Sequence, residues 1–383
     1  IKSATTGTGA ALERLFITGV SPVTMDDVTS GFNIGTNITN DSWFNDLVGF
    51  SENELREMLE YYKEQGVLQE SIDEIVAMMK PNYDNYCFSE DTLEQCMFNS
   101  DMALYFLKSF VLHHKKPKEI VDPNIRTDFN KLAYLIKLDH GLGENFSVIK
   151  EIAEQGEIIT DIVTHFSALE MTDPSNFKSL LFYFGLLSIK GVDMVGRPIL
   201  HVPNLVVREQ LFNFLIQGYI KHDIFKIDMN KMSALFENMA FRGDWKPLFD
   251  FIANAVREQS RIREYIEGEA HIKGFLLAYL GMYRYYQLYP EYELNKGFAD
   301  FFFKPSPSAP VMPPFTYLLE VKYAKAGASE KEIRALADEA REQLLRYSED
   351  ELVAEAKAKG ELKLITIVWR SWELVLLEEV TLS

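Results

Sequence analysis

Two strand-like segments toward the C-terminal end of the chain constrain its fold more than any other feature. Residues 297–303 read Gly-Phe-Ala-Asp-Phe-Phe-Phe, and residues 315–323 read Phe-Thr-Tyr-Leu-Leu-Glu-Val-Lys-Tyr. Both segments are rich in aromatic and branched residues, and a loop with several prolines and serines separates them. Such residues favour extended backbone, and such loops join neighbouring strands. The pattern therefore predicts an antiparallel pair of strands.

Charged side chains interrupt these apolar strands. Because side chains of a strand alternate between its two faces, Glu320 and Lys322 share a face. Asp300 on the first strand adds a second carboxylate, so the pair is expected to gather two carboxylates and an amine. Carboxylate oxygens suit Mg²⁺, which can polarise a phosphate and lower the pKa of a bound water. Lys322 can orient that water or offset charge on the phosphate. The implied reaction is phosphodiester hydrolysis.

The order of these residues adds a family resemblance. An Asp, a spacer and Glu-x-Lys, followed by a helix and another apolar strand, resembles the PD-(D/E)XK nuclease superfamily, in particular the branch fused behind an AAA-ATPase-like domain. Asp300, Glu320 and Lys322 match the three motif positions, while Ala299 stands where the motif name has Pro. The resemblance implies that Asp300 and Glu320 bind Mg²⁺ or Mn²⁺ and that Lys322 positions the attacking water.

A helix before the strand pair is expected to support this site. Residues 263–280 combine an acidic start with a long apolar face, which predicts a helix. The resemblance implies a metal-supporting Glu on it. Glu269 is the preferred candidate for this role, and Glu267 is the second candidate.

The segment after the strand pair predicts the rest of an α/β core. Ser329 and Glu332 form a capping-box signature for a helix through residue 347, on which the resemblance gives Gln343 a place that faces the active site. The remaining expected elements are a helix over 348–359 and strands over 362–369 and 372–377. The expected fold class is mixed α+β, with largely helical N-terminal and middle parts before an α/β nuclease core that has a small mixed sheet.

Other interpretations stay open. Asp300 could merely end a turn, and Glu320 with Lys322 could form a surface ion pair that contributes less than about 1 kcal/mol. We favour the catalytic interpretation because the motif, the acidic helix and the helix with Gln343 occur together. A non-catalytic regulatory or binding module, and a scaffold whose ATPase lies before Ile1, are the alternatives.

The N-terminal residues resemble the distal part of an AAA-ATPase-like domain. Residues 13–20 read as a short strand ending near Thr18, where AAA-type folds carry a polar residue that senses nucleotide, and Ser51 with Glu54 predicts a capped helix. The sequence has no Gly-x-x-x-x-Gly-Lys-Ser/Thr loop to cradle phosphates. We therefore expect the C-terminal fragment of a longer protein, in which ATP is used only by the full-length chain and any homo-oligomer forms through the ATPase part.

The middle of the chain is similar to a winged-helix module. Residues 176–189 predict a helix, 190–203 a small hairpin and 205–220 a second helix. Winged-helix modules read DNA or join proteins, and the many Phe and Leu with few Lys or Arg favour a packing role. The expected domains are 1–120 (AAA-like part with helical lid), 121–255 (helical linker and winged-helix-like module) and 256–383 (nuclease-like).

Composition limits the partners. The formal net charge of −18 disfavours a protein that coats nucleic acid, because non-specific affinity comes mainly from phosphate neutralisation, although a catalytic cleft can be locally basic. The two cysteines, Cys87 and Cys96, are too few and too far apart in sequence for a zinc site without help from His, and reduced thiols are favoured over a disulfide. No apolar run approaches the roughly 18 residues of a membrane span, and no N-terminal signal is evident, so a cytoplasmic protein is expected. The expected partner is nucleic acid, with DNA favoured over RNA.

Overall fold

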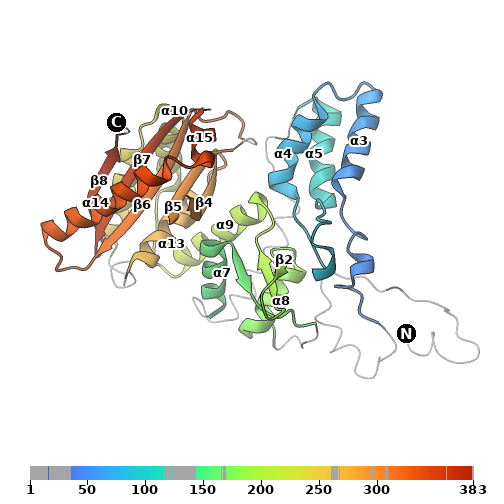
Figure 1. Ribbon diagram of the computed structural model, residues 1–383, viewed down its shortest axis with the longest axis horizontal. Coiled ribbons are helices and arrows are strands. Elements are labelled where there is room, and N and C mark those ends of the chain that lie inside the picture. The colour runs from blue at the N-terminus through green and yellow to red at the C-terminus, as the bar shows by residue number, and fades with distance from the viewer. Residues whose placement is uncertain are drawn as a thin grey trace, which may run out of the picture. The chain divides into compact units, whose positions relative to one another are not determined.

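The computed structural model combines helices with two β-sheets (Figure 1). It describes residues 16, 36–115, 117, 121, 144–164, 166, 170–259, 266, 268–294, 297–306, 309–358 and 360–381. The predicted mixed α+β class is confirmed. The predicted strand ending near Thr18 lies outside the described residues.

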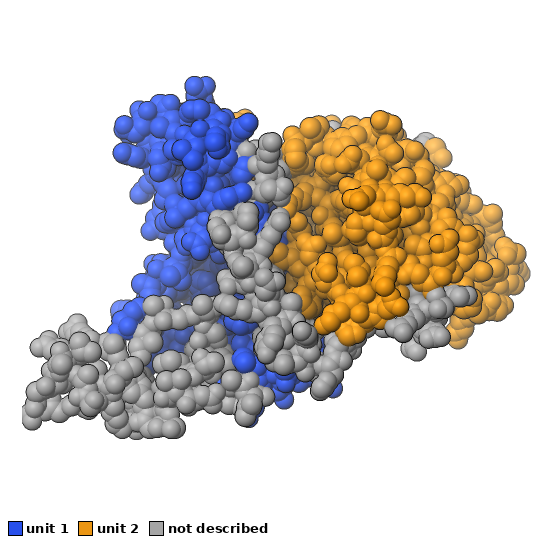
Figure 2. Space-filling view, turned by 180° about the vertical axis from the view of Figure 1, so that it is seen from behind, with its two compact units in different colours: residues 1–72, 80–148, 156–207 blue, residues 73–79, 149–155, 208–383 orange. Residues whose placement is uncertain are grey.

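The chain divides into two compact units (Figure 2). Unit 1 comprises Ile1–Ile72, Lys80–Val148 and Gly156–Val207, and unit 2 comprises Asp73–Met79, Ile149–Gln155 and Arg208–Ser383. Three helices have residues in both units: α4 (Ile72–Tyr83), α7 (Glu144–Gln155) and α9 (Leu205–Lys221).

Unit 1 holds short helices and the smaller sheet. Its elements are η2 (Ser42–Phe44), α3 (Glu52–Glu64), η3 (Glu90–Thr92), α5 (Ser100–His113), β1 (Glu157–Ile159), α8 (Pro174–Tyr183), β2 (Ser188–Val192) and β3 (Pro198–His201). The capping box predicted from Ser51 and Glu54 is confirmed at the start of α3: the Ser51 hydroxyl accepts from the Glu54 N–H, and the Glu54 carboxylate accepts from the Ser51 N–H. Cys87 and Cys96 are free thiols, as expected.

The smaller sheet contains the predicted hairpin. Its strand order is β1-β3-β2 and all its pairs are antiparallel. The helix predicted over 176–189 was wrong at its end, because Gly185 has a φ of +71° and Ser188 begins β2. Strand β1 was not predicted, since three residues are too few to display the alternation of a strand. The assignment as a winged helix stays a prediction.

Unit 2 is built on the five-stranded sheet. Its elements are α10 (Met229–Arg242), α11 (Lys246–Glu258), α13 (Glu269–Leu280), β4 (Tyr286–Leu294), β5 (Gly297–Pro305), β6 (Phe315–Ala324), α14 (Glu330–Tyr347), α15 (Glu351–Ala358), β7 (Glu361–Arg370) and β8 (Glu373–Val380). The strand order is β4-β5-β6-β7-β8; β6 and β7 are parallel and the other neighbours antiparallel. The antiparallel pair of β5 and β6 and the capping box at the start of α14 are therefore confirmed.

Helices cover both faces of the central strand β6. On one face Leu318 packs with Leu344 of α14 and Val353 of α15. On the other face the Tyr317 hydroxyl donates a hydrogen bond of 2.6 Å to the carbonyl of Met239 on α10. A strand buried on both faces has a nearly continuous apolar sequence, so a charged residue within it is costly unless it has a partner or a ligand.

Strand β4 was not predicted from the sequence. Pro290 lies in its middle, and proline cannot donate a hydrogen bond to a neighbouring strand. The structure accommodates this residue because β4 is an edge strand. None of the described helices combines the length and apolar character that crossing a bilayer demands.

Gly281, at the end of α13, is packed so tightly that there is no room for a side chain. A Cβ at this position would lie 2.2 Å from ring atoms of Phe212 and 2.7 Å from the carbonyl oxygen of Leu277. Because the Phe212 ring is buried, it has little room to move. Gly281→Ala should lower the free energy of unfolding by about 1–3 kcal/mol in urea denaturation. Gly327→Ala, where a Cβ meets open space, should change it by less than about 0.5 kcal/mol. Equal effects would contradict this packing.

Candidate active site

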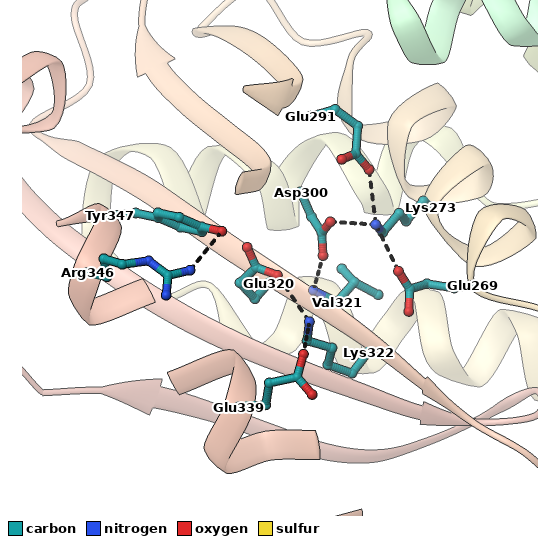
Figure 3. A network of polar contacts seen from close by, with 10 residues as sticks. All are labelled: Glu269, Lys273, Glu291, Asp300, Glu320, Val321, Lys322, Glu339, Arg346 and Tyr347. Carbon is teal, nitrogen blue, oxygen red and sulfur yellow. Dashed lines mark hydrogen bonds and ion pairs between the residues drawn. The ribbon is translucent and has the colours of Figure 1, made fainter. Parts of the chain in front are cut away.

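The three motif residues meet on the adjacent strands β5 and β6 (Figure 3). Asp300 and Glu320 are only 5% and 1% exposed. The backbone N–H of Val321 donates to Asp300 Oδ2 at 2.6 Å, which ties the Asp300 side chain to the neighbouring strand. Lys322 Nζ lies 3.8 Å from Glu320 Oε2. The predicted gathering of two carboxylates and an amine is therefore present.

The environment of Glu320 disfavours its charge. Burial, together with the neighbouring Asp300 carboxylate, raises the pKa of Glu320 to about 9, although Lys322 and Lys273 act in the opposite direction. Glu320 Oε1 is buried and has no hydrogen-bond partner among the residues that the structure describes. A buried acceptor of this kind is stabilised by a proton, a water or a cation.

Helix α14 places Glu339 against Lys322. Glu339 Oε1 lies 3.0 Å from Lys322 Nζ, on the side away from the interior, since the Glu339 side chain is 58% exposed. Only the Glu339 partner of this pair is exposed, since the Lys322 side chain is 14% exposed. The pair holds the Lys322 ammonium between α14 and Glu320.

The same helix carries Gln343. Helix α14 runs antiparallel to β6, because Ala324 packs with Ile333 near the start of α14 and Leu318 packs with Leu344 near its end. Gln343 precedes Leu344, which packs in one cluster with Leu318 in the first half of β6. Its Oε1 is buried, and none of the described residues offers it a hydrogen bond. The place facing the active site that the sequence predicted for Gln343, and its role there, stay predictions.

Glu269 is linked to Asp300 by an ion pair with Lys273, a residue that was not predicted from the sequence. Lys273 Nζ lies 2.9 Å from Glu269, 3.0 Å from Glu291 and 2.5 Å from Asp300 Oδ1. Burial lowers the pKa of Lys273, but the combined effect of its carboxylate partners is larger and the net shift is upward, so Lys273 is charged. The i,i+4 spacing of Glu269 and Lys273 on one helix was the signal that could have found this pair. Glu267 lies outside the described residues.

The Asp300–Glu320 pair fits a divalent cation. No group of three His, Cys, Asp or Glu side chains forms a ready-made metal site in the described ranges. Two buried carboxylates with one unsatisfied oxygen nevertheless supply the hard oxygen donors that Mg²⁺ or Mn²⁺ takes from a protein, with water or phosphate completing the coordination.

The raised pKa of Glu320 predicts a pH dependence of stability in metal-free protein. Between an unfolded value near 4.5 and a folded value of about 9, the folded state holds a proton that the unfolded state has lost. This contribution is therefore complete below the unfolded value and is lost as the pH rises through the folded one. The wild type should therefore lose stability as the pH rises from about 5 to about 8. Glu320→Gln has no carboxyl group that titrates at this position, so the free energy of unfolding of the variant minus that of the wild type should increase over the same range. Urea denaturation in EDTA measures this difference, and parallel pH profiles would contradict the assignment.

Comparison with known proteins assigns this region. Residues 267–379 match the family model described as PD-(D/E)XK nuclease superfamily, which spans the site and all of the five-stranded sheet except the last residue of β8. Among curated proteins no match was found. Neither comparison supports an AAA-ATPase-like part, which stays a prediction. Members of the superfamily are typically metal-dependent nucleases that generally use Mg²⁺ or Mn²⁺. The C-terminal part of the chain, residues 267–379, is therefore a PD-(D/E)XK nuclease superfamily domain.

Proposed function

We propose that unit 2 hydrolyses phosphodiester bonds of nucleic acid with a Mg²⁺ or Mn²⁺ ion held by Asp300 and Glu320. The observation that carries this proposal is the buried pair of carboxylates, with a Glu320 oxygen that lacks a partner among the described residues. Membership of residues 267–379 in a nuclease superfamily supports the reaction class.

Asp300 and Glu320 would bind the ion from adjacent strands. When bound, the ion supplies Lewis-acid polarisation of a phosphate and a lowered pKa for a coordinated water. The Val321 N–H would keep Asp300 oriented through its Oδ2. Because both carboxylates are buried, their interactions act in a region of low dielectric, where they are stronger than in water.

Lys322 would act on the water and the phosphate. Its ammonium lies 3.8 Å from Glu320 Oε2, close enough to donate to a water or a phosphate oxygen at the same place. The proximity of a fixed positive charge to the phosphate stabilises the negative charge that develops during attack. Glu339 would position this ammonium from α14, where it accepts a hydrogen bond of 3.0 Å from Lys322.

Gln343 and Glu269 would have supporting roles. The buried Gln343 Oε1 needs a donor, and a water or a substrate hydroxyl would provide one. Glu269 would support the ion either directly or through Lys273, with which it pairs at 2.9 Å.

Several broader features of the proposal rest on the sequence. We propose DNA as the substrate and a cytoplasmic location. We also propose an AAA-ATPase-like part of a longer protein, which would use ATP and mediate any homo-oligomer. The net charge of −18 favours a nuclease that acts with help from such a part, because the chain as a whole repels phosphates.

Cleavage assays test the proposal. Linear, circular and single-stranded DNA are incubated with the protein and Mg²⁺ or Mn²⁺, and EDTA should abolish cleavage. Asp300→Asn and Lys322→Met should each lower the rate by at least about a hundredfold, because each removes a group that acts on the transition state. Asp338→Asn and Lys331→Met, which make the same chemical changes at exposed positions of α14, should retain the wild-type rate.

Two results would contradict the catalytic proposal. Cleavage that survives both Asp300→Asn and Lys322→Met in folded protein would place the activity elsewhere. Metal binding that Asp300→Asn removes, without cleavage of any of the three substrates, would favour the non-catalytic binding module instead. Thermal melts of each variant establish that the variant is folded.

A further inference from the structure

Three carboxylates converge on one half-buried lysine ammonium beside the proposed metal ligands. Lys273 Nζ contacts Asp300 Oδ1 at 2.5 Å, Glu269 Oε1 at 2.9 Å and Glu291 Oε1 at 3.0 Å. Only 18% of the Lys273 side chain is exposed. Asp300 is thus satisfied at both oxygens by the protein itself, by Lys273 at Oδ1 and by Val321 at Oδ2 (Figure 3).

Glu291 joins this group from strand β4 and has an unusual backbone conformation. It lies within β4, where the flanking pairs Pro290↔Phe301 and Tyr292↔Ala299 put it across from Asp300. Its φ is +43°, in the left-handed region that non-glycine residues seldom adopt. Like charges opposite each other on neighbouring strands repel. A cation shared by both offsets that repulsion, and Lys273 is this cation.

We propose that Lys273 competes with the divalent cation for Asp300, and that Glu269 and Glu291 hold Lys273 when it leaves Asp300. This inference rests on the proposed function, since it takes Asp300 as a metal ligand. Lys273 and the ion both need Oδ1, and two cations on one carboxylate oxygen repel each other. The other two carboxylates keep the displaced ammonium paired, so it does not remain buried without a partner.

The competition predicts opposite effects for neighbouring substitutions. Removal of the ammonium frees Asp300, so Lys273→Met should tighten metal binding. Glu291→Gln removes one of the alternative partners of Lys273, so Lys273 should stay on Asp300 and metal binding should weaken. In Lys273→Met protein there is no ammonium to stay on Asp300, so the weakening caused by Glu291→Gln should be mostly lost. Glu291→Gln should therefore weaken binding less in Lys273→Met protein than in the wild type.

Calorimetric titration of the intact chain with Mn²⁺ tests this inference. The proteins are the wild type, Lys273→Met, Glu291→Gln and their double variant, at one pH and ionic strength. We expect a tightening of about tenfold for Lys273→Met and a weakening of similar size for Glu291→Gln. Lys150→Met is the matched control. Lys150 is a half-buried lysine on the unit 2 part of α7 that pairs with Glu154 at 3.8 Å, and its removal should change the affinity by less than about threefold.

The outcomes separate this inference from the proposed function. Absence of Mn²⁺ binding in both the wild type and Lys273→Met would contradict the metal site and the competition together. Binding by the wild type that Lys273→Met leaves unchanged or weakens would contradict the competition alone. An effect of Glu291→Gln that is equally large with and without Lys273, or a Lys150→Met effect as large as that of Lys273→Met, would do the same. Glu291→Gln keeps the test decisive if Lys273→Met fails to fold, because unchanged affinity in Glu291→Gln also contradicts the competition.

Discussion

Burial of Glu320 next to Asp300 is the constraint on which the rest of the site depends. Strand β6 has helices on both faces, so a carboxylate in its middle loses nearly all contact with water. Burial, together with the neighbouring Asp300 carboxylate, disfavours the charge of Glu320 and raises its pKa. The protein retains an energetically costly pair at a place where apolar residues would pack well. The proposed divalent cation would offset both charges at once.

Two lysines supply the positive charge that the protein itself brings to these carboxylates. Lys322 lies near Glu320 and is held by Glu339 of α14, while Lys273 comes from α13 and pairs directly with Asp300. They differ in what a metal would do to them. Lys322 lies beside the proposed ligands and would act on substrate, whereas Lys273 is paired with an oxygen of Asp300, itself a proposed ligand. The tasks proposed for the two lysines therefore differ: Lys322 would act in catalysis, and Lys273 would supply counter-charge to Asp300.

The sequence predicted those parts of the site that local patterns determine. Alternation along β6 put Glu320 and Lys322 on one face, and the Ser329–Glu332 capping box began the helix that carries Gln343. The missed parts depend on contacts distant in the chain. Lys273 meets Asp300 only because α13 packs beside the sheet. Glu291 lies on strand β4, which was not predicted because Pro290 in its middle argued against a strand. Glu269 was expected to support the metal directly, and its ion pair with Lys273 was not predicted.

Crystals of the intact chain soaked in Mn²⁺ would test the central claim most directly, because Mn²⁺ gives an anomalous signal that locates it without assumptions about the site. We expect a peak coordinated by oxygens of both Asp300 and Glu320, with the Lys273 ammonium withdrawn from Asp300 and still paired with Glu269 or Glu291. A peak that avoids these two carboxylates would contradict the proposed metal site. So would an unchanged Lys273–Asp300 pair with no peak at a Mn²⁺ concentration that supports cleavage in solution.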